Sequence, residues 1–159
     1  MSFKLSRNKL FGIKNETTQN TEAAPAVSDY MTIQDATFKI GKNTIERDYK
    51  RGTLDSLASV TAERWSEMEV TVELRNSSSL GYPELASLFT ACGCSSSYAS
   101  TTMSIEPVST APAQMFSPAL TSTVFVHQDG IKYAATGVVG TAKGTLEAGK
   151  IPMVTFSLK

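Results

Sequence analysis

Residues 67–75 carry the pattern that most constrains the fold of this chain. Apolar and polar side chains alternate strictly along this segment. Successive side chains of a β-strand point to opposite faces of a sheet, so the alternation predicts a strand with one dry face and one wet face. The apolar members are Met68, Val70, Val72 and Leu74, and the polar members are Glu67, Glu69, Thr71, Glu73 and Arg75.

Other segments also favour strands. Residues 9–14, 32–40 and 97–107 have a strand tendency. Residues 122–135 predict a hairpin whose turn, Asp129-Gly130, requires positive φ angles. Residues 141–158 predict a second hairpin that turns between Glu147 and Lys150, and its last strand directs Val154, Phe156 and Leu158 inward.

One helix is expected, over residues 83–92. Pro83 suits the first helical turn, where its missing N–H costs nothing, and Glu84 suits the positive end of the helix dipole. Gly93 fits a left-handed C-terminal cap. The spacing of Leu85, Leu88, Phe89 and Cys92 forms one apolar face.

These patterns predict a mainly β fold, an antiparallel β-sandwich or barrel with one flanking α-helix and long interaction loops. The length of 159 residues fits a single domain, 1–159. Residues 1–8 are basic and polar and are interpreted as an N-terminal arm. Residues 15–30 have the composition of a long loop, which is uncommon inside a compact monomer and often forms an interface.

Residues 41–64 are polar, charged and only patchily periodic, and are expected to form an extended hairpin or loop with Arg51-Gly52 near its tip. One interpretation is a mobile loop. The favoured one is an arm that docks on a neighbouring subunit, because the segment is too apolar for full solvation. The inter-subunit candidates, including two from the N-terminal arm, are Lys4, Arg7, Ile45, Arg47, Tyr49, Arg51, Leu54 and Leu57.

Charge and composition argue against several functional classes. Fifteen basic and fifteen acidic residues cancel, whereas proteins that grip nucleic acid usually carry a basic excess. We therefore expect any DNA to be passed along without specific binding. The chain shows no signal peptide and no membrane-spanning stretch, which predicts a product kept in the cytoplasm until assembly and no membrane partner.

Catalytic and metal sites are poorly supported. A nucleophile pair of Cys92 or Cys94 with His127 and Asp129 is conceivable, but Cys92 lies on an apolar helix face and His127 beside a hairpin turn. Two cysteines one residue apart rarely form a disulfide. With one distant histidine they fall short of a closed tetrahedral metal site. The glycines of residues 137–140 lack the sequence of a phosphate-binding loop. We expect no enzyme, no cofactor and no metal.

Several segments, in order, resemble the tail tube proteins of long-tailed phages and prophages. Residues 14–25 resemble the Glu-Thr-Thr…Ala-Ala-Pro opening of that family, and residues 45–48 its Val-Glu-Arg segment. Residues 70–74 are similar to its central strand, and residues 83–93 to its Pro…Leu-Leu…Ala-Cys-Gly helix. The closing hairpins match through Asp129-Gly130, Gly140-Thr141 and residues 147–152, although Lys150 replaces the usual acid.

The resemblance implies a structural virion protein that forms hexameric rings. These rings would stack through arms and loops into a tail tube for DNA ejection, with other tail proteins as partners. Each copy would give about four strands to a shared barrel, and about two dozen strands leave a lumen wider than a porin's. Alternatives are a tail terminator, completion or baseplate-proximal ring of the same fold, or a β-sandwich module that binds carbohydrate or a host surface.

The glutamate face has two interpretations. It could be an ordinary solvated sheet face, or it could line a channel where negative charge keeps DNA from sticking. The lumen-lining candidates are Glu67, Glu69, Thr71 and Glu73.

Overall fold

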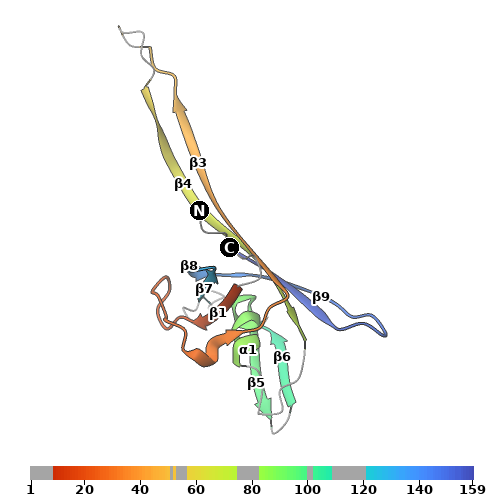
Figure 1. The fold of residues 1–159 in the computed structure, drawn as a ribbon. Coiled ribbons are helices and arrows are strands. Elements are labelled where there is room, and N and C mark those ends of the chain that lie inside the picture. The colour runs from red at the N-terminus through yellow and green to blue at the C-terminus, as the bar shows by residue number, and fades with distance from the viewer. Residues whose placement is uncertain (1–8, 51, 53–56, 75–82, 100–101, 109–120) are drawn as a thin grey trace.

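The structure of the chain, a computed structural model, describes residues 9–50, 52, 57–74, 83–99, 102–108 and 121–159. Two four-stranded antiparallel sheets and a two-stranded hairpin make up its described β-structure (Figure 1). A single α-helix lies beside them in the described residues. The predicted class, mainly β and antiparallel with a flanking helix, is confirmed.

The first sheet has the strand order β2-β1-β7-β8. The turn between its last two strands follows the sequence prediction, because Asp129 and Gly130 have φ angles of 46° and 80°. Two consecutive left-handed residues match the right-handed twist of the flanking strands. The strands are β1 (Lys9–Asn15), β2 (Tyr30–Met31), β7 (Ser122–Gln128) and β8 (Ile131–Val138).

The second sheet has the order β3-β4-β10-β9. Its two long strands pair with each other well beyond the part of β4 that also pairs with β10. The described residues of 41–66 thus form a two-stranded hairpin, here called the arm, that projects from the body (Figure 1). The strands are β3 (Asp35–Arg47), β4 (Leu57–Glu73), β9 (Gly140–Thr145) and β10 (Met153–Leu158).

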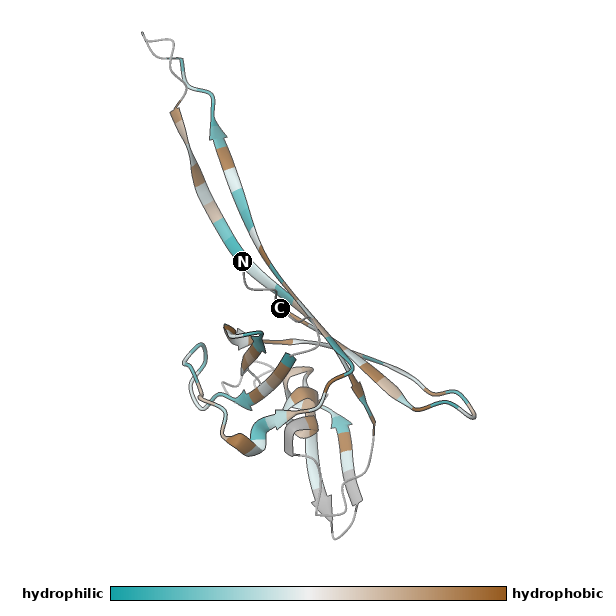
Figure 2. Cartoon of the chain, viewed as in Figure 1, coloured by the Kyte–Doolittle hydropathy of each residue, from teal (hydrophilic) through white to brown (hydrophobic). Residues whose placement is uncertain are grey.

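The core lies between the sheets and under the helix. The predicted inward faces supply it: Val70 and Phe156 are fully buried, and apolar positions recur along the body strands (Figure 2). Other core members come from β1 and β7, so both sheets contribute to one apolar cluster. These members are Phe11, Ile13, Val124, Val126, Met68, Val72, Val154 and Leu158.

Helix α1 (Pro83–Ala91) forms where the sequence predicts it. Leu85 and Leu88 are buried, and Phe89 packs edge-on against Phe156 with ring centroids 5.2 Å apart. Gly93 ends the helix with a φ of 77°, a left-handed conformation that costs glycine little. The helix therefore packs mainly beside β1 and β5, and it reaches β10 through Phe89.

Three boundaries differ from the sequence predictions. Residues 97–107 are not one strand but part of a hairpin, β5 (Cys94–Ala99) with β6 (Thr102–Pro107). The strand expected at residues 32–40 begins at Asp35 and runs on into the arm. Leu74 is 41% exposed, because β4 ends at Glu73, where the inward alternation stops.

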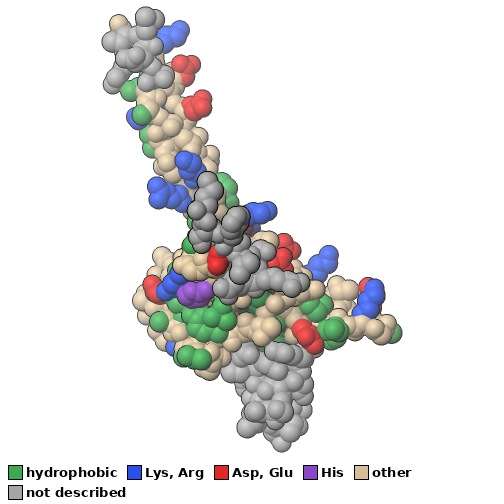
Figure 3. Space-filling model, viewed as in Figure 1, with side chains coloured by type: hydrophobic (Ala, Val, Ile, Leu, Met, Phe, Trp, Pro, Cys, Tyr) green, Lys and Arg blue, Asp and Glu red, His purple; other side chains and the backbone are tan. Residues whose placement is uncertain are grey.

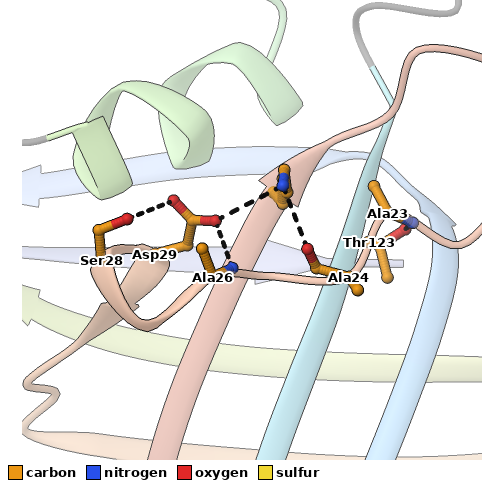
Figure 4. A network of polar contacts seen from close by, with 7 residues as sticks. Ala23, Ala24, Ala26, Ser28, Asp29 and Thr123 are labelled. Atoms are coloured by element: carbon orange, nitrogen blue, oxygen red, sulfur yellow. Dashed lines mark hydrogen bonds and ion pairs between the residues drawn. The ribbon is translucent and has the colours of Figure 1, made fainter.

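Residues 16–29 are held against their own sheet. Lys14 donates to the Ala24 carbonyl, the Ala23 amide donates to Thr123 Oγ1, and the segment ends in the 3-10 turn η1 (Val27–Asp29) (Figure 4). The expected long loop is thus present, but it covers its own β-strands. Its expected role in subunit contacts stays a prediction.

A buried carboxylate anchors this loop. Glu16 is 2% exposed and accepts four hydrogen bonds, two at each oxygen. Burial alone would raise the pKa of Glu16, but the hydrogen bonds together outweigh burial and lower it. The donors are the amides of Gly137 and Asn20 and the hydroxyls of Thr121 and Thr123, at 2.7–2.8 Å.

Candidate assembly surfaces

The polar face of the second sheet brings together all four lumen candidates of the sequence prediction. The neighbours Val70 and Val72 are buried in the core, so the odd-numbered residues of β4 point to the opposite face. Thr71 lies opposite Thr155 of β10, and their hydroxyls are 3.2 Å apart. The face is therefore a regular, hydrogen-bonding surface that contains Glu67, Glu69, Thr71 and Glu73.

Lysines from neighbouring strands also lie on this face, which the alternation in β4 alone could not show. Lys39 of β3 lies opposite Glu67, and Lys159 Nζ forms an ion pair with Glu67 Oε1 at 3.1 Å. Lys143 of β9 lies opposite Thr155. Strand register, which the sequence does not contain, places these charges together. The face is consequently mixed in charge rather than uniformly acidic.

A shallow depression of about 280 Å³ lies on the same face. It is lined by Lys39, Glu67, Glu69, Lys159 and residues beside them. Ion pairs between exposed groups contribute little to stability. The depression is thus lined by both signs of charge.

The arm is a hairpin of paired strands, which is one of the two structures, extended hairpin or loop, that the sequence predicts. The Arg47 guanidinium donates to the Ala58 carbonyl across the two strands at 3.0 and 3.2 Å. Register shifts interrupt the pairing twice, between Asn43 and Thr44 and between Ile45 and Arg47. β-bulges of this kind increase strand twist.

Apolar side chains on the arm remain in contact with solvent. Ile45 is 54% exposed and lies opposite Val60, while Tyr49 is 68% exposed. Trp65 lies on the backbone of Gly41, where an added Cβ would collide with its ring. Figure 3 shows charged and apolar side chains interspersed along the arm. The arm therefore exposes apolar side chains on both of its strands.

The other inter-subunit candidates have different positions. Leu57 is half-buried at the start of β4. Lys4, Arg7, Arg51 and Leu54 lie outside the described residues.

A second depression, of about 460 Å³, lies at the opposite end of β3 and β4 from the arm. Its lining is mainly apolar: Ile33, Ile151 and Met153, flanked by Glu73 and Lys150. Ile151 is 63% exposed. The same long strands thus carry an exposed apolar projection at one end and an apolar hollow at the other.

Two of the groups considered for catalysis have defined surroundings. Burial, with a smaller effect of Cys94, raises the pKa of the Cys92 thiol to about 11, which disfavours the reactive thiolate. His127 contacts the Tyr30 hydroxyl at 3.3 Å and packs against the Phe125 ring. Within the described residues, no three His, Cys, Asp or Glu side chains gather as metal ligands. No helix in this part of the chain is long and apolar enough to cross a membrane.

The fold and these surfaces define a β-rich structural protein, with a polar sheet face and a projecting arm. The chain matches the family model described as phage tail tube protein over residues 6–159, and it belongs to that family. It is a structural component of a phage tail. No curated protein matches the chain.

A solved structure has a similar fold: a chain in the cryo-EM structure of the anti-feeding prophage (AFP) baseplate, 6-fold symmetrised. The likeness has a TM-score of 0.56 at 9% sequence identity, and it covers 100% of this chain and 92% of the other. This similarity is one of fold.

Proposed function

We propose that this protein assembles into hexameric rings that stack into the tail tube, the conduit through which phage DNA leaves the virion. Its partners in this proposal are further copies of itself and other tail proteins. The tail tube family and the fold shared with a chain of a sixfold-symmetrised baseplate support the proposal. The observation that carries it is the geometry of β3 and β4, which join a polar sheet face to a long arm.

The polar face would line the lumen. It offers hydroxyls and both signs of charge, and its glutamates are near Lys39 and Lys159. A uniformly basic lining would retain DNA through its phosphates, whereas this mixed lining gives the duplex no continuous basic track. Glu67, Glu69, Thr71 and Glu73 are the proposed lining residues of β4.

The arm would connect successive rings. The 17 residues of β4 span about 55 Å at the usual rise per residue. The arm of one copy would enter the hollow around Ile33 and Ile151 of a copy in the next ring. A projection at one end and a hollow at the other make a head-to-tail contact, which generates an open stack rather than a closed dimer.

A second candidate function is a ring at one end of the tube, close to the baseplate. The baseplate origin of the similar structure favours it. Such a ring would form but would not polymerise alone.

Electron microscopy of the purified protein tests both candidates. We expect rings that extend into tubes as the concentration rises. Rings that never stack would favour the terminal ring. A species that stays monomeric at high concentration would contradict both.

A further inference from the structure

The outer edge of β3 is blocked at one residue. Asp35 Oδ1 accepts a hydrogen bond from the Ala36 amide at 2.8 Å, and Lys9 Nζ donates to the Ala36 carbonyl at 2.8 Å. Lys9 and Asp35 also form an ion pair at 2.9 Å. The hydrogen bond that Lys9 donates to Asp35, the Ala36 amide and the Lys9 charge lower the pKa of Asp35. Lys9, Asp35 and Ala36 are called the edge clamp below.

The clamp shows which way the backbone groups of β3 point. β3 is the last strand on its side of the sheet, with β4 as its only neighbour among the described strands. The N–H and C=O of Ala36 are both bound by side chains, so they point away from β4. Outward-pointing residues alternate along an antiparallel strand. Phe38 and Ile40 therefore present the next N–H and C=O groups along this edge.

The opposite edge of the sheet, β9, can be assigned in the same way. Val139 and Lys159 exchange both backbone hydrogen bonds, at 2.9 and 2.8 Å. The register between β9 and β10 has no shift, so Thr141 and Lys143 also face β10. Gly140, Ala142 and Gly144 consequently direct their backbone groups outward.

The two edges are complementary in direction and in shape. Four antiparallel strands alternate in direction across the sheet, so in a ring β9 of one copy would run antiparallel to β3 of the next. Ile40 lies on the core side of its strand, as do Ala142 and Gly144 of β9. Ile40 is 70% exposed in the single chain. Small residues on the incoming strand leave room for this side chain.

In the proposed ring the sheets share one barrel, so β9 of one copy would pair with β3 of the next. We propose that the edge clamp stops this pairing at Ala36 and fixes its register at Phe38 and Ile40. The partner is a second copy of this chain, and the inference rests on the proposed ring. Charged side chains on an edge strand commonly prevent further strand addition. Here the block covers only the first outward-facing position of β3, so it selects one alignment and leaves the rest of the edge open.

Disulfide trapping tests the joint. In a Cys92→Ala, Cys94→Ser background that still forms rings, copies with Ile40→Cys are mixed with copies carrying Ala142→Cys or Gly144→Cys. Adjacent strands bring such positions within disulfide range. Lys143→Cys, on the opposite face of β9, is the matched control. We expect covalent dimers at Ala142 or Gly144 to exceed those at Lys143 by at least about tenfold.

The outcomes separate the joint from the ring. Rings without this excess would overturn the joint and leave the proposed function standing. Failure of the wild-type protein to form rings would overturn both.

The clamp is tested by adding Lys9→Met to the same pairs. With the clamp intact, one of the two positions, Ala142 or Gly144, should dominate. Without Lys9, an incoming strand that slips by two residues can also pair with Ala36. The ratio of the two cross-links should then change by about tenfold, the equivalent of one or two hydrogen bonds.

Lys14→Met is the matched control. Lys14 is also a lysine of β1 whose side chain donates to a backbone carbonyl, but that carbonyl belongs to Ala24 rather than to β3. An unchanged ratio after Lys9→Met, or equal cross-links while the clamp is intact, would overturn its role in register.

Discussion

The Glu16 carboxylate accepts a hydrogen bond from the Gly137 amide at 2.8 Å, across 121 positions of sequence. Gly137 has a φ of 68° and lies where β8 carries an extra residue relative to β7. This left-handed glycine turns its amide toward the acid. The bond joins the loop after β1 to β8, the edge strand of the same sheet.

Removing the Glu16 carboxylate should strongly destabilise the fold. Glu16→Ala leaves the Gly137 amide and two threonine hydroxyls without their buried acceptor, and the free energy of unfolding should fall by about 2–4 kcal/mol. Urea denaturation measures it. Glu22→Ala is the matched control: its pair with Lys132 is exposed and 3.9 Å long, so it should cost less than about 0.5 kcal/mol. Equal losses would contradict the anchoring role.

The same group predicts a pH dependence. The pKa of Glu16 is lower in the folded chain than its ordinary value, so its stabilising effect is complete above the ordinary carboxylate pKa. The effect is lost as the pH falls through the folded-state value. The urea midpoints of the wild type and Glu16→Gln should therefore converge on acidification. A constant difference between them down to a pH of about 3 would refute the assignment.

The contact between Trp65 and Gly41 predicts a local change in the arm. Gly41→Ala places a Cβ against the indole ring and should displace Trp65, the only tryptophan in the chain. Its fluorescence maximum should shift while the melting temperature changes little, because the arm lies outside the core. In Gly52→Ala a Cβ meets nothing within 4 Å, and the spectrum should stay unchanged. A similar spectrum in Gly41→Ala and wild type would argue against the packing.

The proposed lumen can be probed by access. In the cysteine-free background, Glu69→Cys should react with a bulky polymer-linked maleimide in the monomer but not in assembled tubes. Glu106→Cys on β6 is the control and should react in both states, since β6 is not part of the proposed lining. Reaction of Glu69→Cys in intact tubes at the rate of the monomer would place it on an outer wall.

The arm is expected to control stacking rather than ring formation. Ile45→Lys puts a charge on an apolar contact, so rings should persist while tubes become short or disappear. Val27→Lys, at a position that is 91% exposed outside the arm, should leave tube length unchanged. Electron microscopy measures both, and normal tubes from Ile45→Lys would contradict arm docking.

Sequence patterns predicted the strongly periodic elements well. The strict alternation in β4 placed Val70 and Val72 in the core, and Asp129-Gly130 specified its own turn. Local chemistry decides these features, so a short window of sequence contains them. The helix ending at Gly93 is predictable for the same reason.

Features that depend on register or on distant partners were not predictable. Lys39 and Lys159 reach the glutamate face only because strands far apart in sequence align there. Glu16 looked like one more polar residue in a loop, yet it is buried by groups that lie more than 100 positions away. Nothing in residues 15–30 alone distinguishes this buried acid from an exposed one.

Because the arm is only two strands wide, its own subunit gives it few contacts beyond its cross-strand pairs. An isolated two-stranded hairpin is marginally stable in water. In the proposed tube, docking must therefore order the free arm. The conformational entropy lost in this step lowers the affinity of any single attachment. A new ring attached through one docked arm could still dissociate, whereas a ring attached through all of its docked arms would remain bound. Misplaced rings would thus dissociate during tube growth before they become stably attached.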